Sequence, residues 1–190
     1  PKWITFGGSY PGILSALFRE KHPELTVGAV ASSAPLYFTF DMWQYAVSVE
    51  ETLRTKSNEC ADSVASAFSA MSQASLSTDG LKTLSDKLHV TPPFDATTTQ
   101  MDIFNFFELI FAYFQDNVQY TYDGRSTSTQ TVRNIDSLCA MMTNETIPDP
   151  IDRVWAYMQW MDSLDDVDTQ TFDPYYADYM NTVNLTNFDN

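Results

Sequence analysis

Apolar residues in the first forty positions fall into two short runs with a helical pattern between them. Residues 2–6 and 25–35 are nearly continuous in apolar or small side chains, which is typical of strands buried on both faces. Residues 13–19 repeat apolar side chains at helical spacing. A strand, a helix and a strand within forty residues form the unit that joins parallel strands. The pattern therefore predicts an α/β fold for residues 1–40.

From residue 41 onward helical spacing predominates, and we expect a mostly α-helical domain over residues 41–190. The predicted helices cover residues 42–54 (with Asp41 as N-cap), 60–74, 78–89, 99–120, 132–142 and 151–164. The helix that Thr99 opens is apolar nearly all round, which predicts that it is buried. Residues 165–190 are polar and acidic, and we expect them to be irregular. Six Met and Trp residues fall at helical spacing, where core packing is a more frequent use than a substrate groove: Met141, Met142, Trp155, Met158, Trp160 and Met161.

The charge of the chain limits the classes of partner. Ten basic and 25 acidic residues give a formal net charge of −15, of which residues 1–40 contribute +1 and residues 41–190 contribute −16. This charge disfavours nucleic acid and anionic membranes, and no apolar run is long enough to span a bilayer. The two histidines and two cysteines lack metal-ligand spacing, and Gly7-Gly8 lacks the lysine of a phosphate loop. We therefore expect no metal and no cofactor.

The candidate chemistry lies at the turn Gly7-Gly8-Ser9-Tyr10-Pro11-Gly12. A serine at a tight strand-to-helix turn is typical of the nucleophile elbow of α/β-hydrolases, which exposes the hydroxyl above the sheet edge. The backbone N–H of Tyr10, at the start of the helix, would be free to bind an oxyanion. Pro11 replaces the second glycine of the G-x-S-x-G pattern, and proline is tolerated in a first helical turn. The alternative is a glycine-rich turn whose serine only caps the helix.

The stretch from Trp3 to Leu36 resembles the serine peptidases of the prolyl carboxypeptidase, dipeptidyl peptidase and thymus-specific serine protease family. The resemblance rests on the elbow GGSY, the helix after it and the strand that ends in SSAP, and the Pro11 form is most similar to the thymus-specific branch. It implies an α/β-hydrolase core at residues 1–40, a helical lid inserted at residues 41–190, and an exopeptidase that cleaves peptides next to proline through a Ser-Asp-His triad, with Ser9 as the nucleophile.

The resemblance also places Ile13 where the family lines its proline-side pocket, although Ile13 could equally pack the helix against the sheet. Two other functions stay open. One is a lipase or esterase of the same fold, whose lid would be apolar and mobile, whereas this insert is very acidic. The other is a non-catalytic family member or binding module. Peptides are the expected substrates, and a homodimer is left open.

Triads in this fold follow the chain order serine, aspartate, histidine. The two histidines after Ser9 are therefore the candidates in this sequence for the base that deprotonates it. His22 lies at the end of the first helix, where it favours the helix dipole as a C-terminal cap. His89 closes a later helix, where we expect a structural or solvated role. We therefore expect the triad Asp and His to lie beyond Asn190, and residues 1–190 to be an internal piece that is inactive alone.

Cys60 and Cys139 are the only cysteines and lie in separate predicted helices. An even count favours pairing in an oxidising compartment, and the resemblance implies the same bridge because family members place cysteines in these two helices. Two buried free thiols are the alternative. Asn144 and Asn184 begin Asn-X-Thr sequons in polar surroundings. These sequons predict N-glycosylation and a secreted, lysosomal or endosomal location.

Overall fold

The computed structural model describes residues 2–37, 39–122, 132–177 and 180–181. The chain divides into two compact units, Pro1–Gln44 and Tyr45–Asn190. The boundary that the sequence predicts, between residues 40 and 41, lies four residues before this division. Each unit is described below by itself.

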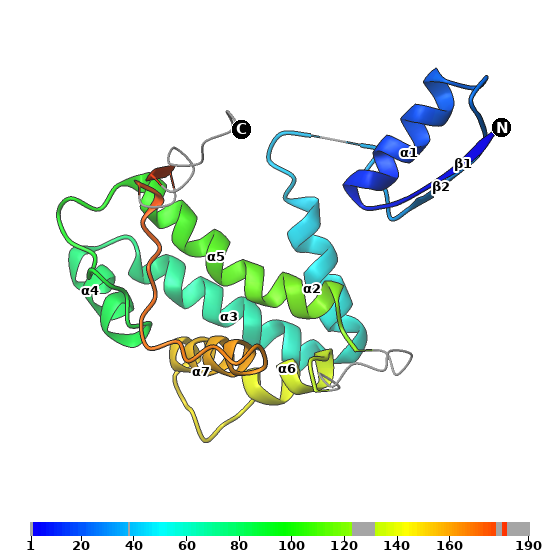
Figure 1. Cartoon of the computed structure of the whole chain (residues 1–190). Helices are drawn as coiled ribbons and strands as arrows, with labels where there is room; N and C mark the ends of the chain where they lie inside the picture. Colours follow the sequence, from blue (N-terminus) through cyan, green and yellow to red (C-terminus); the bar gives the residue numbers. More distant parts are fainter. Residues whose placement is uncertain (1, 38, 123–131, 178–179, 182–190) are drawn as a thin grey trace. The chain divides into compact units, whose positions relative to one another are not determined.

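The first unit is a strand, a helix and a second strand that pairs in parallel with the first (Figure 1). Its elements are β1 (Trp3–Gly8), α1 (Tyr10–Lys21) and β2 (Thr26–Ser32). Ser15 of α1 donates a hydrogen bond to the hydroxyl of Thr5 on β1 at 2.8 Å. Arg19 and Lys21 lie in the last turn of α1, where positive charge favours the helix dipole. The predicted strand–helix–strand order is confirmed.

The apolar side chains of the two strands are exposed, although the sequence predicts burial on both faces. Phe6 on β1 is 74% exposed, and Val30, its partner on β2, is 46% exposed. The reason is that two strands and one helix, as the described residues supply them, cannot cover both faces of a sheet. Continuous apolar strands of this kind are typical of the interior of a larger parallel sheet.

Among its described residues the second unit contains six helices of eight or more residues (Figure 1), the first of which begins one residue before Tyr45. They are α2 (Gln44–Lys56), α3 (Asn58–Ala74), α4 (Thr78–Lys87), α5 (Gln100–Gln119), α6 (Ile135–Met142) and α7 (Pro150–Ser163). Helix α3 packs against α4, α6 and α7, and α5 packs against α6 and α7. The core has a continuous set of buried apolar side chains from all six helices, including Leu53, Met71, Leu84, Phe106, Ile110, Phe114, Leu138, Tyr157 and Met158.

Side-chain caps decide where several of these helices begin. Ser57, Ser77 and Asn134 each accept a bond from a backbone N–H in the first turn of the helix that follows. Asn134 explains why α6 begins at Ile135 rather than at residue 132. The prediction that Asp41 caps a helix at residue 42 is wrong, because Asp41 has a φ of 52° and the helix begins only at Gln44.

Helix α5 is buried on one side and exposed on the other, so the prediction of a buried helix holds for one side only. Phe106, Ile110 and Phe114 are in the core, whereas Phe104 is 58% exposed. The Met and Trp stripe does belong to the core, as predicted: Met142, Trp155, Met158 and Met161 are buried, and Met141 and Trp160 pack against them.

Residues 172–176 are tied to α5 and to the segment after α4, although the sequence predicts that residues 165–190 are irregular. Phe172 forms a parallel bridge with Val90. The carboxylate of Asp102 in the first turn of α5 accepts a bond from the Tyr176 N–H at 3.1 Å. The same carboxylate forms a capping box with Thr99. Residues 182–190 lie outside the described part of the chain.

Burial raises the pKa of Asp102, but the hydrogen bonds from the Thr99 hydroxyl, the Thr99 N–H and the Tyr176 N–H outweigh it, so its pKa lies below the ordinary value. A carboxyl whose pKa is lowered by folding stabilises the fold above its unfolded pKa, and this stabilisation is lost as the pH falls through the folded pKa.

The predicted disulfide is present in the structure and joins α3 to α6. The Cα atoms of Cys60 and Cys139 lie 5.1 Å apart, within the range that a disulfide bridges. Both residues belong to the core of the helical unit. The bridge closes a loop between positions 79 residues apart. The alternative of two buried free thiols is therefore excluded by the structure.

Replacing both cysteines with alanine should lower the free energy of unfolding of the helical unit by about 4 kcal/mol, because the unfolded chain regains the entropy of an open loop. Urea denaturation of the oxidised protein, followed by helical circular dichroism, measures the difference. A reductant should destabilise the native protein and leave the double alanine variant unchanged. Alkylation of both thiols in native, unreduced protein would contradict the bridge.

Asp102→Asn should destabilise the helical unit by about 2 kcal/mol at pH 7, because a charged acceptor for three donors is lost. The difference between the two proteins should shrink below about pH 4, because the Asp102 carboxyl of the unmutated protein is then protonated in the unfolded state and loses its stabilising charge in the folded state as the pH falls further. Asp86→Asn is the matched control, since Asp86 is exposed on α4 and has no hydrogen-bond partner among the described residues. A pH-independent difference would rule out the carboxylate as its cause.

Candidate active site

Ser9 lies at the junction of β1 and α1, in a backbone conformation that L-residues rarely adopt. Its φ is 56° and its ψ is −129°. The Ser9 N–H donates to the carbonyl of Ser32 on β2 at 2.9 Å, which holds the junction against the neighbouring strand. Ser9 occupies the N-cap position of α1, yet its hydroxyl makes no capping hydrogen bond. The exposed hydroxyl is therefore not used to cap the helix.

The backbone approaches closely at two glycines around Ser9, and at Gly7 it leaves no room for a side chain. A Cβ atom on Gly7 would lie 2.1 Å from the carbonyl oxygen of Pro11. A Cβ atom on Gly12 would lie 3.0 Å from the Cβ of Ala34 and 3.1 Å from the carbonyl oxygen of Ser32. Gly12, one position after the usual second glycine of the motif, thus allows α1 to approach the end of β2 closely.

The N-terminus of α1 presents one free backbone donor beside Ser9. The N–H groups of Gly12 and Ile13 donate to the Ser9 carbonyl at 2.9 and 3.3 Å. Pro11 has no N–H. Among the described residues the Tyr10 N–H has no hydrogen-bond partner. A free N–H at the positive end of a helix is suited to binding an oxyanion.

His22 is too far from Ser9 to act as its base, and His89 has a packing contact within the helical unit. His22 is the C-cap residue of α1, and its N–H donates to the Phe18 carbonyl at 2.8 Å. The twelve-residue helix separates His22 from Ser9 by about 18 Å. His89 lies in the helical unit and stacks on Trp155, with ring centroids 4.7 Å apart. The structural roles that the sequence predicts for both residues agree with these contacts.

Comparison with known proteins decides the family. A sequence profile of the serine carboxypeptidases S28 matches residues 1–189. The chain belongs to the serine carboxypeptidase S28 family. The resemblance that the elbow region indicates is thereby confirmed, and the fold of this family is the α/β-hydrolase fold.

The relatives of this S28 chain include named peptidases. A Caenorhabditis elegans protein named "putative serine protease" is 45% identical over 165 residues, which cover 87% of this chain and 31% of that protein. Human lysosomal Pro-X carboxypeptidase is 34% identical over 100 residues, or 51% of this chain and 20% of that protein. Human thymus-specific serine protease is 43% identical over 70 residues, which cover 35% of this chain and 14% of that protein. The chain therefore spans less than a third of the length of these relatives.

Ile13 lies on the packed side of α1 and is only 7% exposed. Gly12 and Ser15, its neighbours on the helix, are also buried. This position fits the packing role that the sequence left open for Ile13. A role in the proline-side pocket of an S28 peptidase stays a prediction.

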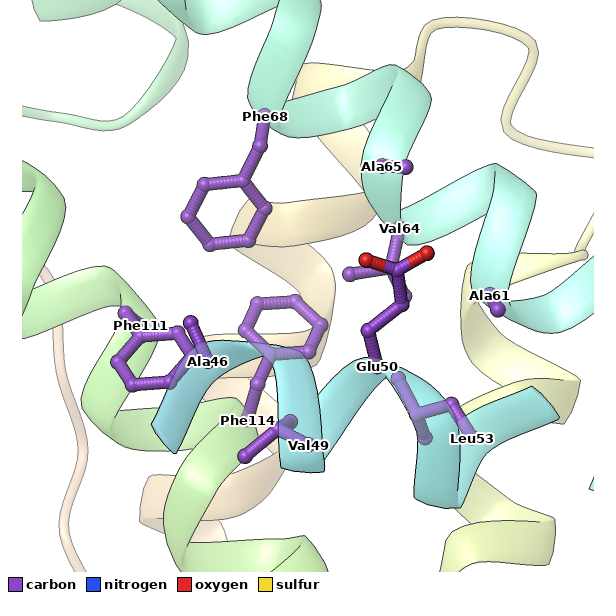
Figure 2. Close-up of a pocket in the computed structure, with 10 residues that line it drawn as sticks. All are labelled: Ala46, Val49, Glu50, Leu53, Ala61, Val64, Ala65, Phe68, Phe111 and Phe114. Carbon is purple, nitrogen blue, oxygen red and sulfur yellow. The ribbon is translucent and has the colours of Figure 1, made fainter. Parts of the chain in front are cut away.

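The helical unit contains an apolar cavity of about 210 Å³ between α2, α3 and α5 (Figure 2). Its apolar lining consists of Ala46, Val49, Leu53, Ala61, Val64, Ala65, Phe68, Phe111 and Phe114, and its only charged lining residue is Glu50. The Glu50 carboxylate bonds to Arg54 at 2.7 Å, and Arg54 also bonds to Asp62 of α3 at 2.8 Å. The sequence does not predict this cavity, because α5 lies far along the chain from the neighbouring helices α2 and α3 that form its other walls.

The described residues contain no group of three His, Cys, Asp or Glu side chains that could hold a metal ion. In the same part of the chain, no helix is both long and apolar enough to cross a membrane.

Gly7→Ala should reduce the reaction of Ser9 with a fluorophosphonate probe by about 100-fold or more in the full-length protein. The added Cβ would collide with the Pro11 carbonyl, and a shift of about 1 Å at a catalytic group has effects of this size. Gly28→Ala is the matched control, because a Cβ there meets only Ile4 at 4.0 Å, an ordinary contact. Equal labelling of both variants would show that the close approach at Gly7 does not position Ser9.

Proposed function

We propose that this chain is the nucleophile-bearing part of a serine exopeptidase that hydrolyses peptide bonds next to proline. The observation that carries the proposal is Ser9, which stands at a strained strand-to-helix junction with an uncapped hydroxyl in a chain of the S28 family. The preference for proline is supported by the similarity to human lysosomal Pro-X carboxypeptidase. The aspartate and histidine of the triad would come from a part of the full-length protein outside this chain.

In the proposed reaction the Ser9 Oγ attacks the carbonyl carbon of the substrate while a histidine removes its proton. The carbonyl oxygen becomes an oxyanion, and the Tyr10 N–H donates to it. A single donor of this kind contributes about 3 kcal/mol to transition-state stabilisation. The intermediate collapses, the protonated amine leaves, and water then hydrolyses the acyl-enzyme. Tyr10 follows Ser9 directly, and its N–H has no partner among the described residues, so it is available to the oxyanion that forms beside the Ser9 Oγ.

The helical unit would act as a lid that restricts the active site to the end of a peptide. Exopeptidase action needs a barrier against long chains. The helices α2 to α7, packed around one core, are large enough to provide this barrier. Its disulfide and continuous core support a rigid barrier rather than a mobile apolar flap. The proposed domain boundaries are therefore a hydrolase core at residues 1–40 and a lid at residues 41–190.

A secreted, lysosomal or endosomal location is part of the proposal. The Cys60–Cys139 bridge requires an oxidising compartment in most organisms. A relative named as lysosomal supports the same location. The acidity of residues 41–190 suits an acidic lumen, because protonation of carboxylates reduces the repulsion between them.

Ser9→Ala in the full-length protein should abolish hydrolysis of proline-containing peptides and remove fluorophosphonate labelling. Loss of a nucleophile lowers kcat by about a million-fold in serine peptidases, so residual turnover should be undetectable. Ser72→Ala, an exposed serine on α3, is the control and should keep full activity.

Three results would contradict the proposal in different ways. Labelling of another serine would remove Ser9 as the nucleophile. Hydrolysis of simple esters without cleavage of any peptide would indicate an esterase. Full-length protein that neither reacts with the probe nor cleaves either substrate would be a non-catalytic family member.

A further inference from the structure

The loop between α6 and α7 carries the sequence Asn144-Glu145-Thr146, and the structure gives it a defined turn. The Asn144 side-chain oxygen accepts a bond from the Thr146 N–H at 3.0 Å and another from the Thr146 hydroxyl at 2.7 Å. The Ile147 N–H donates to the Asn144 carbonyl at 3.1 Å. A side chain that closes a turn on the backbone two residues later is typical of asparagine in a surface loop.

In this geometry the oxygen and the nitrogen of the Asn144 side-chain amide have different surroundings. Both bonds go to the oxygen, while the side-chain nitrogen has no acceptor among the described residues. Donors on the oxygen stabilise the negative charge that it gains when the amide nitrogen gives up a proton and acts as a nucleophile. The nitrogen can therefore form a new bond without the loss of any hydrogen bond in the fold.

The loop is exposed, yet hydrogen bonds from Arg153 fix its backbone. Glu145 and Thr146 are exposed and Asn144 is partly exposed. Arg153 of α7 donates to the carbonyl oxygens of Ile147 at 2.6 Å and of Met142 at 3.1 Å. These bonds use backbone acceptors and leave the side chains of the sequon to solvent.

We propose that Asn144 is a site of N-linked glycosylation in the folded protein. The inference depends on the secreted, lysosomal or endosomal location in the proposed function, because a protein bound for any of these passes through the secretory pathway, where the transferring enzyme and its lipid-pyrophosphate-linked oligosaccharide act. The Asn144 nitrogen forms a bond to the first sugar carbon, and the bond from that carbon to the pyrophosphate oxygen breaks. The lipid pyrophosphate leaves with the bonding electrons, and the amide proton goes to a base of the transferase. The second sequon, at Asn184, lies outside the described residues.

The test is peptide mapping of the full-length protein, produced in a eukaryotic host that secretes it. Treatment with an N-glycan amidase in heavy-oxygen water converts an occupied Asn144 into an isotope-tagged aspartate, which distinguishes it from Asn184. We expect most Asn144 to carry the tag. Thr146→Ala should abolish it, because the hydroxyl donor is lost, and Thr146→Ser should retain part of it. Thr143→Ala, next to the sequon but not in it, is the control and should leave occupancy unchanged.

Two negative results have different meanings. Unmodified Asn144 in protein whose Cys60–Cys139 bridge is oxidised would overturn the glycosylation site and leave the lumenal location intact. Unmodified Asn144 together with two alkylatable thiols would overturn both the site and the location. Fluorophosphonate labelling of Ser9 in the same material reports on the peptidase proposal separately from either result. Occupancy that survives in Thr146→Ala would also contradict the site as described.

Discussion

The close approach of the Gly7 position to the Pro11 carbonyl is the constraint on which the candidate active site depends. No side chain fits between β1 and the first turn of α1, so the chain must reverse within Gly8 and Ser9. The reversal gives Ser9 a positive φ, a sparsely populated conformation that costs about 1–3 kcal/mol for a residue with a Cβ. The bond from the Ser9 N–H to Ser32 on β2 opposes that cost. Strain of this kind in a serine points toward function, because capping alone would use an ordinary extended conformation.

The helical unit is stabilised in a different way, by a large core and by ties between distant segments. The disulfide joins α3 to α6, and Lys87 at the end of α4 pairs with Asp149 and Asp152 at the start of α7. Asp102 ties the segment near Tyr176 to α5. Because these ties connect positions far apart in the chain, they restrict the unit as a whole rather than any single helix. A unit built in this way is suited to a fixed steric barrier.

The two units also differ in what they leave exposed. The first has few charges and presents apolar strand faces, of which Phe6 is the clearest example. The second carries nearly all of the negative charge and has a continuous buried core, although single apolar residues such as Leu76 and Phe104 are exposed. The contrast agrees with the continuous apolar pattern of β1 and β2, which is typical of a larger parallel sheet, and with a second unit that folds around its own core.

Sequence alone was sufficient to predict the elements that depend on local pattern. The strand–helix–strand order, the elbow at Ser9, the approximate helices and the core role of Met158 and Trp155 follow from periodicity, glycine placement and capping residues. The pairing of Cys60 with Cys139 was predicted from an even count and a family resemblance, since no local pattern can bring α3 to α6. Tertiary structure alone decided the rest. Exposure of β1 and of one side of α5, the cavity beside Glu50 and the tie from Asp102 to Tyr176 depend on which segments become neighbours, and a one-dimensional pattern does not contain that information.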